Sequence, residues 1–287
     1  MQADALNTIE AFWDAMPRPM SNVLACGPFT IFASRAPFPF YARPTLGLPP
    51  SHVFAPSEVH AARVRLSQLG LPVAFEWSPT LAPTLADAIE AVGLPIRRVP
   101  LMLFEDPVFQ DPVCQDPVFE VRRPRPLLDG SHIRFLAHDD PMLAVTRAAI
   151  DIGWSQIDTA TGPAGVTERD TAAGDPKRLA YAQWRVQENL AVMAAAVDDV
   201  DGPVGGGMCV SVDAAAEITG VAVMPSHRRR GLAGELTSAL AFDAQSRGCT
   251  TVFVTANDDA VAHIYARVGF CTIDVACIAE APEPVEG

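Results

Sequence analysis

The sequence has no long hydrophobic run: no apolar stretch approaches the roughly 20 residues that a helix needs to cross a bilayer. The first residues, Met-Gln-Ala-Asp-Ala-Leu, contain neither the basic region nor the apolar region of an export signal, so we expect a cytoplasmic protein. No CxxC pair and no metal-ligand spacing is present. We therefore expect no metal, and we interpret the 6 cysteines as free, mostly buried thiols: Cys26, Cys114, Cys209, Cys249, Cys271 and Cys277.

Positive charge is also scarce. The chain has 21 basic against 34 acidic residues, a formal net charge of -13. A field of that sign argues against nucleic acid or an anionic membrane as partner. It is weakly compatible with a cationic small molecule, although most acidic residues of a soluble protein only solvate its surface.

Apolar residues are plentiful, at 49% of 287 residues against 19% charged. This composition predicts a folded chain with a sizeable core and excludes a mainly disordered one. The length suits one large domain or two modest ones.

A proline-rich segment interrupts the chain at residues 105–130. The triplet Asp-Pro-Val starts at Asp106, Asp111 and Asp116. Proline at every fifth residue blocks a helix and breaks sheet ladders, so we interpret the segment as an extended connector. It would join a domain at 1–104 to one at 131–287, although its Val and Phe residues leave an edge strand as the alternative.

The C-terminal part alternates strand and helix patterns around a polar loop at 158–176. Adjacent strand patterns around the turn Asp201-Gly-Pro predict a hairpin, so we expect an α+β fold with a mixed sheet. Strands are expected at 132–137, 190–197, 204–212, 217–224, 251–255 and 270–278, and helices at 141–152, 177–189, 231–246 and 259–268.

The N-terminal part repeats the end of this pattern. Gly70-Leu-Pro-Val-Ala-Phe corresponds to Gly248-Cys-Thr-Thr-Val-Phe, and Val92-Gly-Leu corresponds, at nearly the same offset, to Val268-Gly-Phe. Both copies have the order helix, Gly, strand, helix, Val-Gly, strand. This predicts two related α/β domains, although helix–Gly–strand units recur in many α/β proteins.

The strongest chemical signal is the segment Val-Met-Pro-Ser-His-Arg228-Arg-Arg-Gly231-Leu-Ala233-Gly234, where a strand ends and a helix begins. The first turn of a helix leaves backbone N–H groups unpaired and carries partial positive charge. Gly231, Ala233 and Gly234 let an anion approach the backbone, and three arginines add charge. The segment predicts a pyrophosphate site that follows neither the Walker nor the GxGxxG pattern.

The motif Arg228-x-x-Gly231-x-Ala233 resembles the (Gln/Arg)-x-x-Gly-x-(Gly/Ala) loop of the GNAT superfamily of N-acetyltransferases. The later segment, ending in Tyr265-Ala-Arg-Val-Gly-Phe270, is similar to that family's second conserved block. The resemblance covers about 204–278. It implies the GNAT acyl-CoA N-acyltransferase fold in the C-terminal half, acetyl-CoA as co-substrate, and acetyl transfer to a primary amine in a ternary complex.

The resemblance also implies residue roles. Tyr265 would be the general acid that protonates the departing thiolate, with helix packing as the alternative role. The backbone of the strand 221–224 would pair with the pantetheine amides. The expected coenzyme-binding residues are Val221, Val223, Met224, Arg228, Arg229, Arg230, Gly231, Leu232, Ala233, Gly234, Asn257 and Asp258.

The general base is less clearly indicated. Glu217 lies on the strand that precedes Arg228, at a spacing where some family members carry a base, and an exposed strand charge is the alternative. Weaker alternatives are Glu188, Asp198 and Asp199. Family members with an Asn before the Tyr helix often place it seven residues ahead of the Tyr. Here Asp258 occupies that position and Asn257 lies one residue earlier, which puts the coenzyme contact of Asn257 in doubt. We expect His227 and His263 to be surface or supporting residues rather than catalysts.

The N-terminal copy lacks this machinery. Aligning the two copies places Pro50, Val53 and Ile89 where the second copy has Arg228, Gly231 and Tyr265. We therefore expect a degenerate domain and one active site. The partners we expect are a small-molecule or peptide amine, in a monomer with pseudo-dimeric domains or a homodimer. A non-catalytic acyl-CoA-binding regulatory module, or a transferase for a longer acyl-CoA, remains the alternative.

Overall fold

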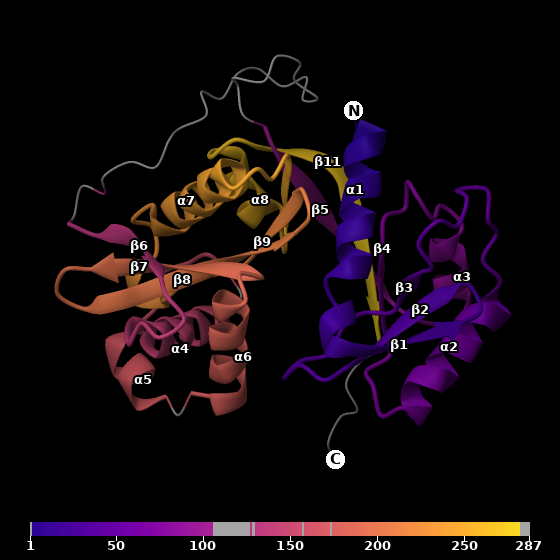
Figure 1. Cartoon of the computed structure of the whole chain (residues 1–287), viewed down its shortest axis with the longest axis horizontal. Helices are drawn as coiled ribbons and strands as arrows, with labels where there is room; N and C mark the ends of the chain where they lie inside the picture. Colours follow the sequence, from indigo (N-terminus) through magenta and orange to yellow (C-terminus); the bar gives the residue numbers. More distant parts are fainter. Residues whose placement is uncertain (1, 106–126, 128–129, 157, 173, 282–287) are drawn as a thin grey trace. The chain divides into compact units, whose positions relative to one another are not determined.

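The computed structural model describes the chain except for residues 1, 106–126, 128–129, 157, 173 and 282–287 (Figure 1). It divides into unit 1, Met1–Leu101 with Ile273–Gly287, and unit 2, Met102–Thr272. The expected connector, 105–130, lies largely outside the described residues. The division after Leu101 falls close to the expected end of the first domain, but the last part of the chain returns to unit 1.

Unit 2 carries most of a mixed sheet, which confirms the expected α+β class. The eight strands of the sheet follow the order β4-β11-β5-β10-β9-β8-β7-β6. Within unit 2, β6 to β9 are antiparallel neighbours and β10 is parallel to β9. The strands involved are β5 (Ile96–Phe104), β6 (His132–Leu136), β7 (Ala191–Asp198), β8 (Gly202–Val212), β9 (Ala215–Val223), β10 (Thr251–Thr255) and β11 (Phe270–Glu280).

Helices cover both faces of this part of the sheet (Figure 1). Leu236 and Leu240 of α7 pack with Ile218 in one buried cluster, and Leu143 and Ile150 of α4 belong to another on the opposite face. The helices of unit 2 are α4 (Met142–Trp154), α5 (Val166–Thr171), α6 (Pro176–Gln187), α7 (Leu232–Ser246) and α8 (Asp259–Ala266), with a 3-10 turn, η2, at Pro225–His227.

Small residues in β8 let these helices approach the sheet. A Cβ on Gly206 would lie 2.5 Å from the Thr146 side chain of α4, and one on Gly207 would lie 3.2 Å from the Leu240 side chain of α7. The first distance is shorter than real Cβ contacts and the second is tighter than most, so a larger residue at either position would press on a helix. The glycines therefore fix how closely both helix layers pack on β8.

The strands and long helices of unit 2 lie within a few residues of their expected positions, but α5 falls inside the expected polar loop. Its residues, Val-Thr-Glu-Arg-Asp-Thr, have little apolar character. The helix is fixed locally, because the Glu168 carboxylate accepts a hydrogen bond from the N–H of Gly165 at 2.8 Å. Val166 is partly buried and packs against the cluster that contains Leu236 and Leu240 of α7.

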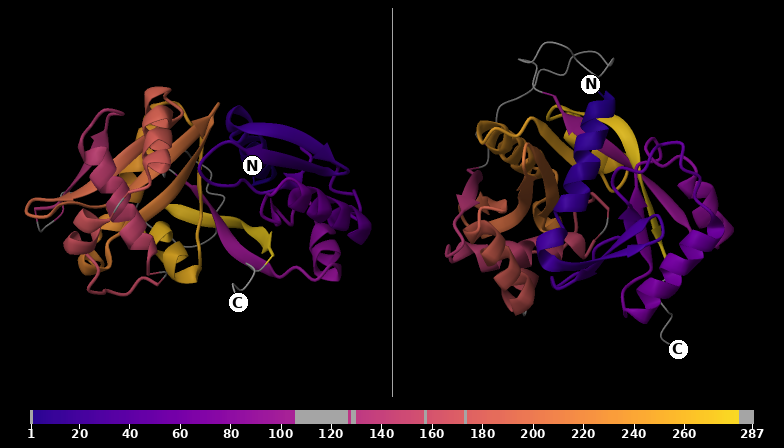
Figure 2. Two further views of the ribbon diagram at one scale, coloured as in Figure 1. Left: turned by 90° about the horizontal axis from the view of Figure 1, so that it is seen from below. Right: turned by 45° about the vertical axis from the view of Figure 1, so that its right-hand side comes forward.

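Unit 1 has its own core. Helices α2 (Pro56–Gln68) and α3 (Leu85–Ala91) lie beside the hairpin of β1 (Ser21–Cys26) and β2 (Phe29–Ser34) (Figure 2). Trp13 and Trp77 are buried, as expected for core aromatics. The other elements are α1 (Gln2–Ala15), a 3-10 turn at Arg18–Met20, β3 (Arg43–Pro44) and β4 (Ala74–Trp77).

The end of β11 completes unit 1. Cys277 pairs with Trp77, and Glu280 with Ala74, in an antiparallel ladder. Cys277 and Ala279 are buried in the same cluster as the α2 and α3 side chains. This pairing explains why the C-terminal strand belongs with the first part of the chain.

The expected repeat has a matching order of elements. In the first copy, Gly70 (φ 66°) follows the end of α2 and Gly93 (φ 76°) the end of α3, and in the second copy Gly248 (φ 92°) follows α7 and Gly269 (φ 106°) follows α8. Positive φ favours glycine at each helix end. The repeated glycines therefore do the same conformational work in both copies, and common descent of the two units stays a prediction.

Four cysteines are free, and all but Cys26 are buried. Cys271 is disulfide-bonded, so the expectation of free thiols is wrong there. The residue type alone could not show this, because pairing depends on which distant segments meet. Cys114 lies outside the described residues.

In the described part of the chain, no helix combines the length and apolarity that crossing a membrane requires. No group of three or more His, Cys, Asp or Glu there is arranged to hold a metal ion.

Candidate functional site

The central feature of unit 2 is a gap in its sheet between β9 and β10. These parallel strands pair over only three positions, of which the last is Phe253 with Glu217. β9 then continues to Val223, while β10 ends at Thr255. In the described chain, the edge of β9 beyond Glu217 therefore has no strand partner on the β10 side.

A β-bulge accounts for this separation. Gly206 opposes Ala222 and Met208 opposes Thr219, so β9 has one extra residue between these pairs. Gly220 in the extra segment has φ 66°. A bulge of this kind bends a strand and increases its twist, which turns the end of β9 away from β10.

The edge of β9 offers backbone groups to a ligand. The N–H of Met224 donates to Val204 at 2.9 Å, while Val223 opposes Gly205. In an antiparallel ladder, residues between hydrogen-bonded positions direct both backbone groups away from the partner strand. The N–H of Val223 therefore points to the open edge, and the N–H of Met224 is already paired within the sheet.

A tight loop follows β9 and leads into α7. Arg229 has φ 67° and Gly231, the residue before α7, has φ 85°. No side chain caps α7, and the first hydrogen bond of this turn is from Glu235 N to Gly231 O at 3.1 Å. Within the described chain, the N–H groups of Leu232, Ala233 and Gly234 therefore lack an acceptor, as an anion site requires.

The loop also has room for a ligand. Among the residues that the structure describes, a Cβ on Gly231 would meet only Leu127, at 4.0 Å, and one on Gly234 would meet only Val268, at 3.5 Å. The surface over these N–H groups is therefore lined by small residues. Steric access and unpaired donors coincide at the start of α7.

The Arg228 guanidinium faces backbone carbonyls and, at 3.6 Å, the Asp158 carboxylate, rather than the start of α7. Its five N–H···O contacts reach the carbonyls of Val223 (3.2 Å), Asp158 (2.5 Å), Ala160 (3.0 Å), Gly153 (2.7 Å) and Gln156 (2.9 Å). The side chain is 11% exposed, and burial lowers its pKa. Arg228 thus caps the end of α4 and ties the segment after it to β9.

The other two arginines differ from each other. Arg230 donates to Asp198 Oδ2 at 2.7 Å and to Ser131 Oγ at 3.1 Å. Arg229 is exposed and makes no hydrogen bond or ion pair with any described residue. Of the three arginines expected at the loop, the structure leaves Arg229 available to a ligand.

Tyr265 lies on α8 among the apolar side chains that pack against α7. It is 7% exposed, and its ring centroid is 6.0 Å from that of Phe270. Burial raises the pKa of its phenol to about 12. The phenol is therefore protonated at neutral pH.

Glu217 occupies the last paired position before the gap. Ile218 packs in the buried cluster that contains Leu236 and Leu240 of α7, so strand alternation directs Glu217 to the face covered by α4. Tyr265 belongs to the same cluster as Ile218. The structure therefore places these two residues on opposite faces of the sheet rather than in contact.

The remaining sequence candidates have local roles. The Asp258 carboxylate caps α8 by accepting from Val261 N at 2.9 Å, and exposed His263 bonds the carbonyl of Asp259 at 2.7 Å. Asn257 precedes this cap. Asp198 pairs with Arg230, which with two backbone N–H groups lowers its pKa to about 2 and makes it a poor base.

His227 is buried, at 7% exposure, and is therefore not a surface residue, the first of the two roles expected for it. Its Nε2 lies 3.0 Å from Asp201 Oδ2 and its Nδ1 lies 2.8 Å from Ser226 Oγ. In the tautomer protonated at Nε2, the ring donates to Asp201 and accepts from Ser226. The sequence showed Asp201 only as part of a hairpin turn.

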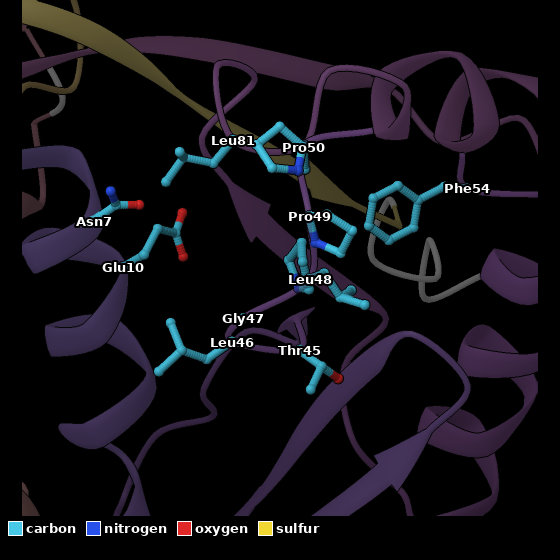
Figure 3. Close-up of a pocket in the computed structure, with 12 residues that line it drawn as sticks. Asn7, Glu10, Thr45, Leu46, Gly47, Leu48, Pro49, Pro50, Phe54 and Leu81 are labelled. Atoms are coloured by element: carbon cyan, nitrogen blue, oxygen red, sulfur yellow. The ribbon is translucent and has the colours of Figure 1, made fainter. Parts of the chain in front are cut away.

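Unit 1 contains a pocket of about 120 Å³ that lies apart from these features in the sequence (Figure 3). Its polar end is formed by Asn7 and Glu10 of α1, and its other walls are mostly apolar. The Glu10 carboxylate accepts from Arg43 at 3.2 Å and from Ser78 N at 3.2 Å. A carboxylate among mostly apolar walls is unsuited to phosphate groups. That unit 1 lacks a coenzyme loop stays a prediction.

Comparisons with known proteins agree with this geometry. Residues 156–270 match the model of the acetyltransferase (GNAT) family. A GCN5-related N-acetyltransferase from Kribbella flavida is 20% identical, with a TM-score of 0.66 over 97% of this chain and 96% of that one. A GCN5-related N-acetyltransferase-like protein from Streptococcus suis is 12% identical, with a TM-score of 0.52 over 98% of this chain and 100% of that one.

No curated protein matches the sequence at a significant level. At these identities the structural likeness establishes the fold, while the family match in unit 2 supports acyl transfer as the general activity. The segment 156–270 contains the gap between β9 and β10, the loop at 228–234 and Tyr265. The chain thus has the fold of the GCN5-related N-acetyltransferases, and its residues 156–270 match the acetyltransferase (GNAT) family model.

Proposed function

We propose that the protein transfers an acetyl group from acetyl-CoA to a primary amine by direct attack in a ternary complex. The observation that carries this proposal is the combination, within one unit, of an open β9 edge and an uncapped helix start. A thioester with a pantetheine arm needs the first for its amides, and a pyrophosphate needs the second for its charge.

The coenzyme would lie along the open edge of β9 and end on the loop. Its pyrophosphate would accept hydrogen bonds from Leu232, Ala233 and Gly234, with Arg229 adding a charge-assisted contact. Arg228 would act indirectly, by holding the loop to α4. Asn257 and Asp258 have no part in this proposal, since the Asp258 carboxylate already caps α8.

The amine would attack the thioester carbonyl from the face that Glu217 occupies. A C–N bond forms, the carbonyl oxygen becomes an oxyanion, and the C–S bond then breaks. The amine proton leaves to Glu217, directly or through water, and the N–H of Val223 stabilises the oxyanion. The departing thiolate is released on the side of Tyr265 and takes its proton from water.

The raised pKa of Tyr265 refines its role. A phenol with a pKa of about 12 is a much weaker acid than a thiol, whose pKa is about 8.5. Complete transfer of its proton to the sulfur is therefore unfavourable. Tyr265 would instead donate a hydrogen bond that stabilises the developing thiolate, which takes its proton from water as it leaves.

The experiment is a thiol-release assay with acetyl-CoA and a panel of amines, including cationic ones because of the net charge of -13. Turnover with an amine, abolished when the amine is omitted, is the expected result. Binding of acetyl-CoA without turnover of any amine would indicate a non-catalytic module. Faster turnover with propionyl- or succinyl-CoA than with acetyl-CoA would contradict the proposed donor.

A further inference from the structure

We infer that Asp198, at the end of β7, and Asp201, in the turn between β7 and β8, are positioning residues that hold the coenzyme loop in its binding conformation. The inference rests on the proposed function and adds residues outside the GNAT motif to it. The two carboxylates hold His227 and Arg230, which bracket Arg228 and Arg229 in the loop.

The first contact joins the end of β7 to the loop. Asp198 Oδ2 accepts from Arg230 Nη2 at 2.7 Å, and Oδ1 accepts from the N–H groups of Val200 and Asp201 at 2.9 and 3.0 Å. The Asp198 side chain is 12% exposed. One carboxylate therefore shapes the hairpin turn and fixes Arg230 at the same time.

The second contact joins the turn to the other side of the loop. Asp201 Oδ2 lies 3.0 Å from Nε2 of His227, whose side chain is 9% exposed. The turn itself is held in place, because Arg169 of α5 donates to the carbonyls of Asp201 and Pro203, both at 2.6 Å. The anchor for His227 is therefore rigid.

The loop needs such support because its backbone is strained. Arg229, a non-glycine residue, has φ 67°, a left-handed conformation that L residues other than glycine rarely adopt. A strained backbone conformation persists only where contacts with the surrounding structure hold it, and such conformations are common at ligand-binding sites. The contacts at His227 and Arg230 supply that constraint on both sides of Arg229.

The consequence concerns affinity for the pyrophosphate. A loop already held open toward its ligand loses less conformational entropy on binding than a mobile one. Releasing the two contacts would weaken ligands that carry a pyrophosphate. Ligands that use only the β9 edge would be unaffected, because that edge is fixed by β8 and the bulge.

The test is calorimetric titration of the full chain with coenzyme A and with S-acetylpantetheine, which lacks the pyrophosphate. The variant is Asp198→Asn/Asp201→Asn, which removes both charges and keeps the side-chain shapes. The matched control is Asp213→Asn, on the turn after β8, where Asp213 has φ 50° and asparagine tolerates that conformation.

In the double variant we expect the Kd of coenzyme A to rise about tenfold and the Kd of S-acetylpantetheine to change less than twofold. The KM of acetyl-CoA should rise in step, with kcat at saturation little changed. The control should match the unsubstituted protein in both titrations. Where the double variant unfolds, Asp201→Asn alone carries the test, because its carboxylate is 37% exposed.

An unchanged Kd of coenzyme A in the folded variant, or equal weakening of both ligands, would overturn the inference and leave the proposed function standing. Absence of coenzyme A binding by the unsubstituted protein would overturn both. The two failures are therefore distinguishable.

Discussion

The adjacent residues Arg228 and Arg229 should respond to alanine substitution in opposite ways. Arg228 makes five hydrogen bonds to carbonyls and is 11% exposed, whereas Arg229 is exposed and makes none with described residues. A hydrogen bond contributes about 1 kcal/mol net. Water can reach some of the freed carbonyls, so we expect Arg228→Ala to lower the free energy of unfolding by about 3 kcal/mol.

For a domain of this size, about 1 kcal/mol shifts Tm by roughly 2–4 °C, so Arg228→Ala should lower the Tm of unit 2 by about 6–12 °C. Arg229→Ala should change stability by less than about 0.5 kcal/mol. It should weaken coenzyme A about fivefold, since an exposed charge contact contributes up to about 1 kcal/mol.

The assays are differential scanning calorimetry and coenzyme A titration on both variants. Arg228→Ala with an unchanged Tm would refute the structural role of its hydrogen bonds. Arg229→Ala with unchanged affinity would refute the assignment of Arg229 as the arginine left for the phosphate.

Further substitutions test single elements of the site. Tyr265→Phe should lower kcat with little change in the KM of acetyl-CoA, and equal kcat for both proteins would show that the phenol takes no part in the reaction. Because the pKa of Tyr265 is about 12, ionisation of the phenol should not lower the kcat of the unsubstituted protein below about pH 11. Gly231→Ala should lower the free energy of unfolding by roughly 1–2 kcal/mol because Gly231 has φ 85°, whereas Gly234→Ala should be tolerated. Thermal melts of the two variants test this, and equal destabilisation would contradict a conformational role for Gly231. Gly153→Ala places a Cβ 2.8 Å from the Ala222 side chain and 3.2 Å from Val223 N, so it should displace the β9 edge and weaken S-acetylpantetheine binding; unchanged binding would show that this edge is not used.

Much of the fold of unit 2 could be predicted because its signals are local. Alternating apolar residues, the Asp201-Gly-Pro turn and glycines at helix ends act over a few residues. The helix α5 could not be predicted because a capping carboxylate, rather than an apolar face, stabilises it. The pairing of β11 with β4 of unit 1 could not be predicted either, because pairing between strands so distant in the sequence has no local sequence pattern.

The site was predictable as a loop but not as a set of side-chain contacts. The spacing of Arg228, Gly231 and Ala233 located the helix start. It could not show that Arg228 faces the end of α4 while Arg229 faces solvent, because most of the carbonyls that Arg228 meets are about 70 residues away in the sequence. Asp198 and Asp201 belong to no sequence motif. Their contacts with Arg230 and His227 form only once the β7–β8 turn lies against the loop in the folded chain.

The central claim is that the start of α7 binds the pyrophosphate of acetyl-CoA, and calorimetric titration of the full chain with acetyl-CoA tests it most directly. Gly231→Glu adds a carboxylate at a position with φ 85°, over the unpaired N–H groups, and serves as the comparison. The account predicts one site per chain, lost in Gly231→Glu while unit 2 stays folded by circular dichroism. Two sites would contradict the degenerate assignment of unit 1, and no binding at millimolar acetyl-CoA would contradict the proposed function.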